Sequence, residues 1–124
     1  MTTKKLALLP EQRRLRERCC ATPSRLSPEA AERVARDLQL LAHPVRLKVL
    51  DLLIRNAGQV CVCDIETSVP VKQPTVSHHL RLLREAGLIE GERNGLWVYY
   101  QVRKPAVAAL RRRLEGTLQL LSGE

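Results

Sequence analysis

Residues 73–100 read QPTVSHHLRLLREAGLIEGERNGLWVYY, and this stretch decides the fold. Val76, Leu80 and Leu83 recur at the spacing of one helix face, and a glycine follows where such a helix would end. Two apolar runs come next, joined by an Asn-Gly pair at 94–95. That pair favours a two-residue type I′ turn, which needs positive φ at both positions. The stretch therefore predicts a helix followed directly by a β-hairpin.

The segment before this stretch predicts two longer helices. Ser27 is a good N-cap and Pro28 suits the first helical position, so a first helix begins there. HPVRLKVLDLLIRN (43–56) restarts a helix at Pro44 and is apolar nearly all round, which is typical of a buried central helix. The other expected elements are a short strand over 59–62, a short helix over 63–69 and an amphipathic last helix over 104–121.

The order of these elements indicates the architecture. Two short helices around a tight turn make a helix-turn-helix, and a hairpin directly behind it makes a wing. We therefore predict a mainly α fold with one β-hairpin, a winged helix-turn-helix. Residues 27–124 form this DNA-binding and dimerisation domain, and residues 1–26, which we call the arm, are expected to be a flexible segment preceding it.

Composition points to a polyanionic partner. The 124 residues hold 21 Lys and Arg against 13 Asp and Glu, a net charge of +8. A basic balance of this size is typical of nucleic-acid binding. No apolar run approaches the roughly 20 residues that span a bilayer, and the first residues lack the apolar core of a secretion signal. We expect a cytoplasmic protein with no membrane partner.

The helix after residue 72 carries a small polar face of a size that fits a major groove about 12 Å wide. Groove-facing side chains would read bases, and basic neighbours and the hairpin tip would contact phosphates. The candidate base-reading residues are Gln73, Thr75, Ser77 and His78. The candidate phosphate contacts are Lys72, Arg81, Arg84 and Arg93, with Asn94 beside Arg93 at the hairpin tip.

Four cysteines form two pairs. Cys61 and Cys63 flank one residue, and Cys19 and Cys20 are neighbours in the arm. In a reducing compartment such residues are more often thiols or metal ligands than disulfides. A lone Cys in an apolar run is usually a small buried hydrophobe, but two pairs with no other cysteine favour ligands. All four are therefore candidate metal ligands.

The motifs HPVRLKVLDLL, CVCDI, QPTVSHHLRLLREAGLI and GLWVYY resemble the ArsR/SmtB family of metal-sensing winged-helix repressors, over about residues 28–121. The resemblance implies a homodimer paired through the first and last helices. It also implies that the metal-free dimer represses a resistance operon at an imperfect inverted repeat, and that the metal-loaded dimer lets go. One position departs from the family pattern: Lys72 stands where Ser usually caps the recognition helix.

The resemblance also bears on the inducer. A family zinc site on the last helix needs carboxylate and His ligands, and residues 104–124 contain no His and no Asp. CVCD resembles the thiolate pair of arsenic, cadmium and lead sensors, but Glu66 stands where some arsenic repressors have a third Cys. As(III), which takes three sulfurs, would then need Cys19 or Cys20, and so would Sb(III). A four-thiolate site for Cd(II), Pb(II) or Zn(II) is the alternative.

Two other classes of protein use cysteine thiols. An enzyme using a nucleophilic thiol would want a C-x-x-C motif or a phosphate-cradling loop, and CVC supplies neither, so no catalytic residue is assigned. A repressor that senses redox state through the same thiols stays open. Of the paired histidines, we expect one to face DNA and the other to pack or face solvent, while His43 before Pro44 is structural.

Overall fold

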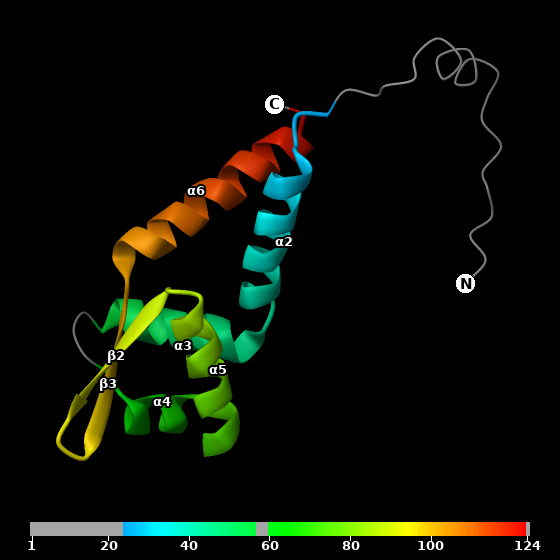
Figure 1. The fold of residues 1–124 in the computed structure, drawn as a ribbon. Helices are drawn as coiled ribbons and strands as arrows, with labels where there is room; N and C mark the ends of the chain where they lie inside the picture. Colours follow the sequence, from blue (N-terminus) through cyan, green and yellow to red (C-terminus); the bar gives the residue numbers. More distant parts are fainter. Residues whose placement is uncertain (1–23, 57–59, 124) are drawn as a thin grey trace, which may run out of the picture.

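The computed structural model describes residues 24–56 and 60–123 (Figure 1). The helices in these ranges are α2 (Pro28–Leu41), α3 (Pro44–Arg55), α4 (Val62–Ser68), α5 (Gln73–Glu85) and α6 (Lys104–Leu121). The strands β1 (Val60–Cys61), β2 (Ile89–Asn94) and β3 (Trp97–Val102) form an antiparallel sheet in the order β1-β3-β2. The predicted order of helices and hairpin is confirmed. Cys19, Cys20 and most of the arm lie outside the described residues.

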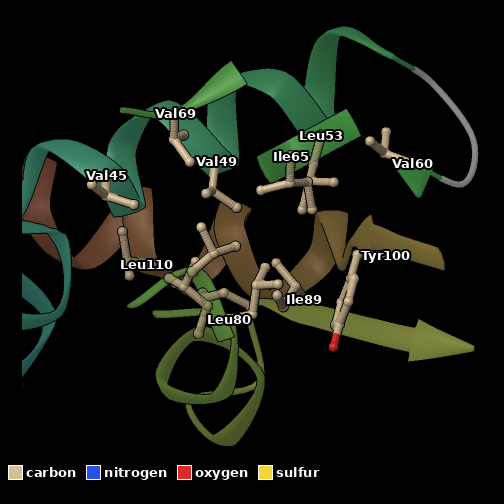
Figure 2. Packing of buried hydrophobic residues seen from close by; sticks show 13 residues of the cluster. Val45, Val49, Leu53, Val60, Ile65, Val69, Leu80, Ile89, Tyr100 and Leu110 are labelled. Carbon is tan, nitrogen blue, oxygen red and sulfur yellow. The ribbon is translucent and has the colours of Figure 1, made fainter. Parts of the chain in front are cut away.

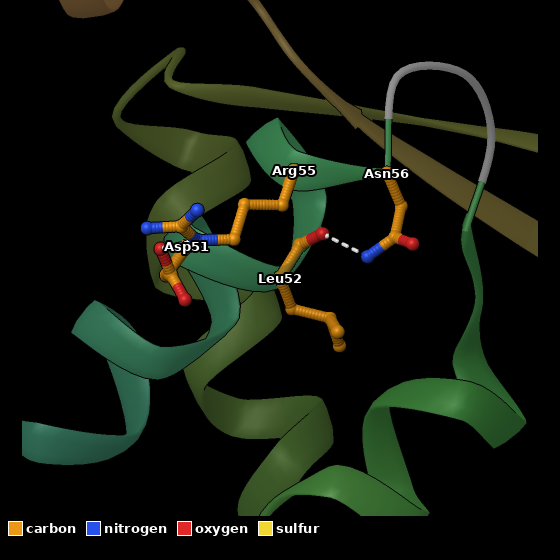
Figure 3. Close-up of polar contacts among 4 residues, drawn as sticks. All are labelled: Asp51, Leu52, Arg55 and Asn56. Atoms are coloured by element: carbon orange, nitrogen blue, oxygen red, sulfur yellow. Dashed lines mark hydrogen bonds and ion pairs between the residues drawn. The ribbon is translucent and has the colours of Figure 1, made fainter.

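Local capping fixes the ends of the first two helices. The Ser27 hydroxyl accepts from the Ala30 backbone N–H at 3.1 Å, as predicted for an N-cap. His43 caps α3 in the same way, because its Nδ1 accepts from the Val45 N–H at 3.2 Å. At the other end, the Asn56 amide donates to the Leu52 carbonyl at 2.7 Å (Figure 3). The structural role expected for His43 is therefore confirmed.

The core lies between α3, α4, α5 and the sheet (Figure 2). Its largest side chains with under 2% exposure are Ile65, Leu80, Leu83, Ile89, Val49 and Val76. These residues come from the four elements that build the helix-turn-helix and the base of the wing. Burial of this kind stabilises by roughly 1.5–3 kcal/mol per large apolar side chain. The hydrophobic core therefore holds α4, α5 and the hairpin in one unit.

α3 is buried on one side only. Val45, Val49 and Leu53 face the core, as their spacing predicts. Leu47 and Ile54, on the opposite side, are 52% and 47% exposed. The predicted central buried helix is therefore found on one side only, because in the described ranges its second side stays about half exposed.

α2 and α6 pack against each other away from the main core. Arg113 on α6 and Asp37 on α2 form a two-point ion pair at 2.8 and 3.1 Å. Beyond this pair, Leu118 and Leu121 are 63% and 71% exposed. α6 thus begins as a core helix, with Leu110 buried, and ends as an uncovered apolar stripe. No helix in the described ranges combines the length and apolar character needed to cross a bilayer.

The hairpin turn differs from the prediction. Asn94 pairs with Trp97 as the last ladder pair, so the loop is Gly95-Leu96 rather than Asn94-Gly95. Of these two loop residues, only Gly95 has a positive φ (64°), which is the pattern of a type II′ turn. The register explains the shift, because it places Gly91 opposite Tyr100. A Cβ at Gly91 would lie 2.9 Å from the Tyr100 ring, so the ring occupies the space that a side chain would need.

Candidate DNA-binding helix and thiolate pair

α5 has one buried and one exposed side. Val76, His79, Leu80 and Leu83 are buried against the core. The predicted contact residues of α5 are all on the exposed side: Gln73, Thr75, Ser77, His78, Arg81 and Arg84. The helix is thus held by its apolar side and presents a polar, basic side to solvent, as a major-groove reader requires.

The start of α5 lacks a side-chain cap in the described structure. Lys72 occupies the N-cap position and makes no side-chain hydrogen bond there. Its carbonyl accepts from the N–H groups of Thr75 and Val76 at 3.0 and 3.1 Å. The Lys72 side chain is exposed at the same end, so it can meet a phosphate there.

The two adjacent histidines divide as expected. His78 is exposed and its Nδ1 lies 3.2 Å from the Arg81 guanidinium. His79 is 4% exposed and its Nδ1 accepts from Arg46 Nε at 3.1 Å. Burial, and after it the neighbouring charges of His43, Arg46 and His78, lower the pKa of His79. Sequence reasoning missed Arg46, since a bond between residues 33 apart leaves no local pattern.

The wing carries Arg93 and Asn94 on exposed positions of β2, next to the tip. The tip itself is Gly95-Leu96, where Leu96 is 97% exposed, and Trp97 beside it is 54% exposed. Arg93 and Asn94 therefore flank the tip instead of forming it. Both side chains are exposed beside the tip.

A cleft of about 500 Å³ separates α5 from the start of α4 and the base of β3. Its polar wall is formed by Ser77, His78, Arg81 and Arg84 of α5, and its other wall includes Val62 and Tyr100. Val62 lies between the two cysteines of the CVC motif. The residue between the two cysteines therefore faces the exposed side of α5 across one cleft.

The thiols of Cys61 and Cys63 converge where β1 becomes α4. Cys61 is buried and stands at the N-cap of α4, while Cys63 is exposed on its first turn. Their Sγ atoms lie 2.8 Å apart. The hydrogen bond to Cys61 raises the pKa of the Cys63 thiol, and burial and the charges of Cys61 and Asp64 act in the same direction. A soft metal ion that binds here must displace that proton.

The pair is not a complete metal site within the described ranges. No group of three or more His, Cys, Asp or Glu side chains in residues 24–56 and 60–123 is arranged to hold a metal ion. Glu66 stands where the resemblance would place a third Cys. It is half-buried and lies one turn further along α4. A three-coordinate As(III) or a tetrahedral divalent ion would therefore need further ligands from elsewhere.

The thiolate pair is also joined to the wing. Cys61 is a strand residue, and it pairs with Tyr99 of β3, as Val60 pairs with Tyr100. β3 in turn forms the hairpin with β2. A change at Cys61 therefore acts on an element that shares a sheet with the wing.

Comparison with known proteins agrees with this architecture. Residues 43–90 match the family described as "Bacterial regulatory protein, arsR family". The chain is 42% identical over 73 residues to the arsenical resistance operon repressor of Escherichia coli, covering 57% of this chain and 62% of that protein. It is 42% identical over 85 residues to the HTH-type transcriptional regulator NmtR of Mycobacterium tuberculosis, covering 68% of this chain and 69% of that protein.

A solved structure shares the fold. The homodimeric winged helix-turn-helix DNA-binding domain of a possible ArsR-family regulator from Mycobacterium bovis superposes with a TM-score of 0.56 at 28% identity, over 84% of this chain and 95% of that one. The predicted winged helix-turn-helix is confirmed. The matched family consists of regulatory proteins, which agrees with the absence of a catalytic assignment. The chain therefore belongs to the arsR family of bacterial regulatory proteins.

Proposed function

We propose that this chain is a repressor that binds operator DNA as a metal-free homodimer and is released when As(III) binds its cysteine thiolates. The observation that carries the proposal is the convergence of Cys61 and Cys63, 2.8 Å apart, at the start of α4, the helix that packs against α5. A thiolate pair at this place can report on a soft metal ion to the DNA-binding helix. The E. coli relative is named an arsenical resistance operon repressor, which supports the choice of ion.

For DNA, α5 is the recognition helix. Two copies in a dimer would enter successive major grooves about one helical turn apart, which matches an inverted repeat. Gln73, Thr75, Ser77 and His78 are proposed to read bases. Lys72, Arg81, Arg84, Arg93 and Asn94 are proposed to contact the backbone, where each cationic contact contributes to salt-dependent affinity.

For the dimer, α2 and α6 are the proposed interface. Leu38, Leu118 and Leu121 leave an apolar surface on these two helices that one chain does not cover. Burying such residues against a second copy removes apolar surface from water at roughly 25 cal/mol per Å². The M. bovis structure of the same fold is described as homodimeric.

The missing thiolates are proposed to come from the partner's arm. The start of α2 lies at one end of the described structure, and α4 lies toward the other end, beyond α3 (Figure 1). α2 alone has 14 residues and so spans about 21 Å. Four residues from Cys20 to Ser24 reach at most about 15 Å. We infer from these lengths that Cys20 does not reach the Cys61–Cys63 pair of its own chain and that a second subunit supplies the remaining sulfur.

As(III) is favoured over divalent ions by the arm. A pyramidal As(III) needs three sulfurs, so one arm sulfur added to Cys61 and Cys63 completes it. A tetrahedral site for Cd(II), Pb(II) or Zn(II) would need both arm sulfurs, and adjacent cysteines constrain that geometry more. Sb(III) has the chemistry of As(III) and is expected to act in the same way.

Inducer binding can reach DNA by two routes. One is the β1–β3 ladder, which ties Cys61 to the wing. The other is the cleft, which places Val62 opposite Ser77 and Arg81 of α5. Because the two ligands are coupled, DNA must weaken As(III) affinity by the factor that As(III) weakens DNA affinity, typically about 1–3 kcal/mol.

The test is operator binding by fluorescence anisotropy under reductant, with As(III), Cd(II), Pb(II) and Zn(II) titrated separately. We expect As(III) to release DNA at the lowest concentration. Cys61→Ser should bind the same DNA as the unmodified protein but should no longer be released from it by As(III). Ser68→Ala, at an exposed position at the other end of α4, is the matched control. Release of Cys61→Ser by As(III) at the normal concentration would refute the ligand assignment.

Redox sensing is the second candidate, since the same 2.8 Å separation favours it. Peroxide would take two electrons and two protons from the Cys61 and Cys63 thiols, forming one disulfide and two waters. Release of DNA by peroxide in a metal-free buffer, with no release by any of the four ions, would favour this function over metal sensing.

A further inference from the structure

Arg46 on α3 closes the end of α2. Its Nη1 donates to the Leu40 carbonyl at 2.9 Å and to the Gln39 carbonyl at 3.4 Å. Both carbonyls belong to the last turn of α2, which contains no basic residue of its own. A cation at this position also complements the negative end of the helix dipole.

The same guanidinium holds α5. Arg46 Nε donates to His79 Nδ1 at 3.1 Å, on the buried side of the recognition helix. A guanidinium can only donate, so His79 must accept at Nδ1 and carry its proton on Nε2. The His43 ring, which caps α3, lies 4.1 Å from the His79 ring between centroids.

The position of Arg46 within α3 is otherwise unfavourable. It lies in the first turn of α3, where the helix dipole disfavours a cation and where no acidic residue offsets it. Its bonds to α2 and α5 therefore account for its place. One side chain thus joins the proposed dimerisation helix to the recognition helix through charge-assisted hydrogen bonds.

We propose that Arg46 and His79 are positioning residues for DNA recognition, which fix the orientation of α5 relative to α2 and so set the half-site spacing that the dimer accepts. The inference rests on the proposed function, because it needs a dimer paired through α2 and α6. In such a dimer the two α5 helices are placed by the path from α2 through α3 to α5. A change in that path displaces both reading helices with respect to each other, while each can still enter a groove alone.

The test separates positioning from binding. Unmodified protein first selects a duplex from a random library, and its half-site is then placed in duplexes whose two half-sites are separated by the selected spacing or by one base pair more or less. A duplex with a single half-site is the reference. We expect Arg46→Gln to lower the preference for the selected spacing by about tenfold, which is roughly the contribution of one of the charge-assisted hydrogen bonds that Arg46 donates. Its affinity for the single half-site should stay within about twofold.

Two variants of His79 provide a matched pair. His79→Asn keeps an acceptor near the position of Nδ1, and His79→Gln moves it to the position of Nε2. We expect His79→Asn to retain the spacing preference and His79→Gln to lose it. Arg36→Gln, which removes the same charge from an exposed position of α2, should behave as the unmodified protein.

The outcomes are distinguishable. If the unmodified protein selects no duplex, the proposed function itself fails. If it selects one and Arg46→Gln keeps the spacing preference, the positioning role is refuted. If Arg46→Gln lowers the thermal midpoint and weakens binding to the single half-site as much as binding to the spaced duplexes, Arg46 acts only in folding. If that variant does not fold, the His79 pair decides, and identical behaviour of His79→Asn and His79→Gln refutes the inference.

Discussion

Ile65 and Leu83 are fully shielded from solvent inside the helix-turn-helix, whereas Leu118 and Leu121 at the end of α6 are 63% and 71% exposed. All four are apolar residues of helices, so residue type alone does not distinguish the buried pair from the exposed pair. The difference lies in what covers each side. α3, α4, α5 and the sheet cover one another within one chain, while α2 and α6 leave an apolar surface that, on our account, a second copy covers. The same contrast holds for the metal site, because Cys61 and Cys63 supply two sulfurs and, on our proposal, the arm of a second copy supplies the next.

The largest effect is expected from a cavity in the core that α3, α4, α5 and the sheet enclose within one chain. Ile65→Ala removes a 0% exposed side chain from the helix that carries Cys63, and such changes cost about 2–5 kcal/mol. The free energy of unfolding in urea should fall by that amount. Leu47→Ala, at a 52% exposed position of α3, is the control and should cost clearly less. Similar losses for both variants would mean that the outer side of α3 is as well covered as the core.

A charge on the exposed apolar surface of α2 and α6 should weaken the dimer instead. Leu118→Asp would bury an unpaired carboxylate in the proposed interface, which we expect to raise the dimer dissociation constant by about a hundredfold, or roughly 2.7 kcal/mol. Sedimentation equilibrium measures this directly. Leu96→Asp, at the 97% exposed wing tip, should leave the dimer intact. A dimer that is equally stable with Leu118→Asp would place the interface elsewhere.

A smaller effect is expected at the start of α5. Lys72→Ser supplies the missing side-chain cap and should raise the free energy of unfolding by about 1 kcal/mol. It should also weaken binding to all DNA sequences alike and lower the salt slope of the dimer by about 2, because each subunit loses one proposed phosphate contact. A change in sequence preference would mean that position 72 reads bases.

The smallest expected effect is a pH dependence of stability from His79. Its pKa is lowered in the folded chain, chiefly by burial and then by His43, Arg46 and His78. Unfolded His titrates near about 6.5, so below that pH the unfolded state binds more protons. The contribution of His79 to the free energy of unfolding should be fully present above pH about 6.5 and decline as the pH falls through the lowered pKa. Thermal midpoints between neutral and mildly acidic pH, compared with His79→Asn, isolate this contribution.

Much of the fold follows from local signals in the sequence. Ser27-Pro28, the spacing of Val76, Leu80 and Leu83, and the two β-prone runs predict elements that the structure confirms. The turn lies one residue later than predicted. In the observed register the Tyr100 ring packs over Gly91, and this is a contact between two strands. Turn propensity alone does not carry that information.

The candidate site was predictable in its residue types but not in its connections. CVC indicates a thiolate pair, and the structure adds that Cys61 shares a sheet with the wing. The bond between Arg46 and His79 depends on how α3 crosses α5, and no periodicity within either helix predicts it. The reach of the arm could be bounded only after the distance along α2 was known.

The most direct test of a site shared between subunits uses mixed dimers. One subunit carries Cys19→Ser and Cys20→Ser, the other carries Cys61→Ser and Cys63→Ser, and two affinity tags isolate the heterodimer. As(III) binding is then counted by calorimetry under reductant. We predict one bound As(III) per heterodimer and none in either mutant homodimer, because only the heterodimer brings an intact arm to an intact pair. A heterodimer that binds none, or an arm-mutant homodimer that binds as the unmodified protein does, would contradict the account.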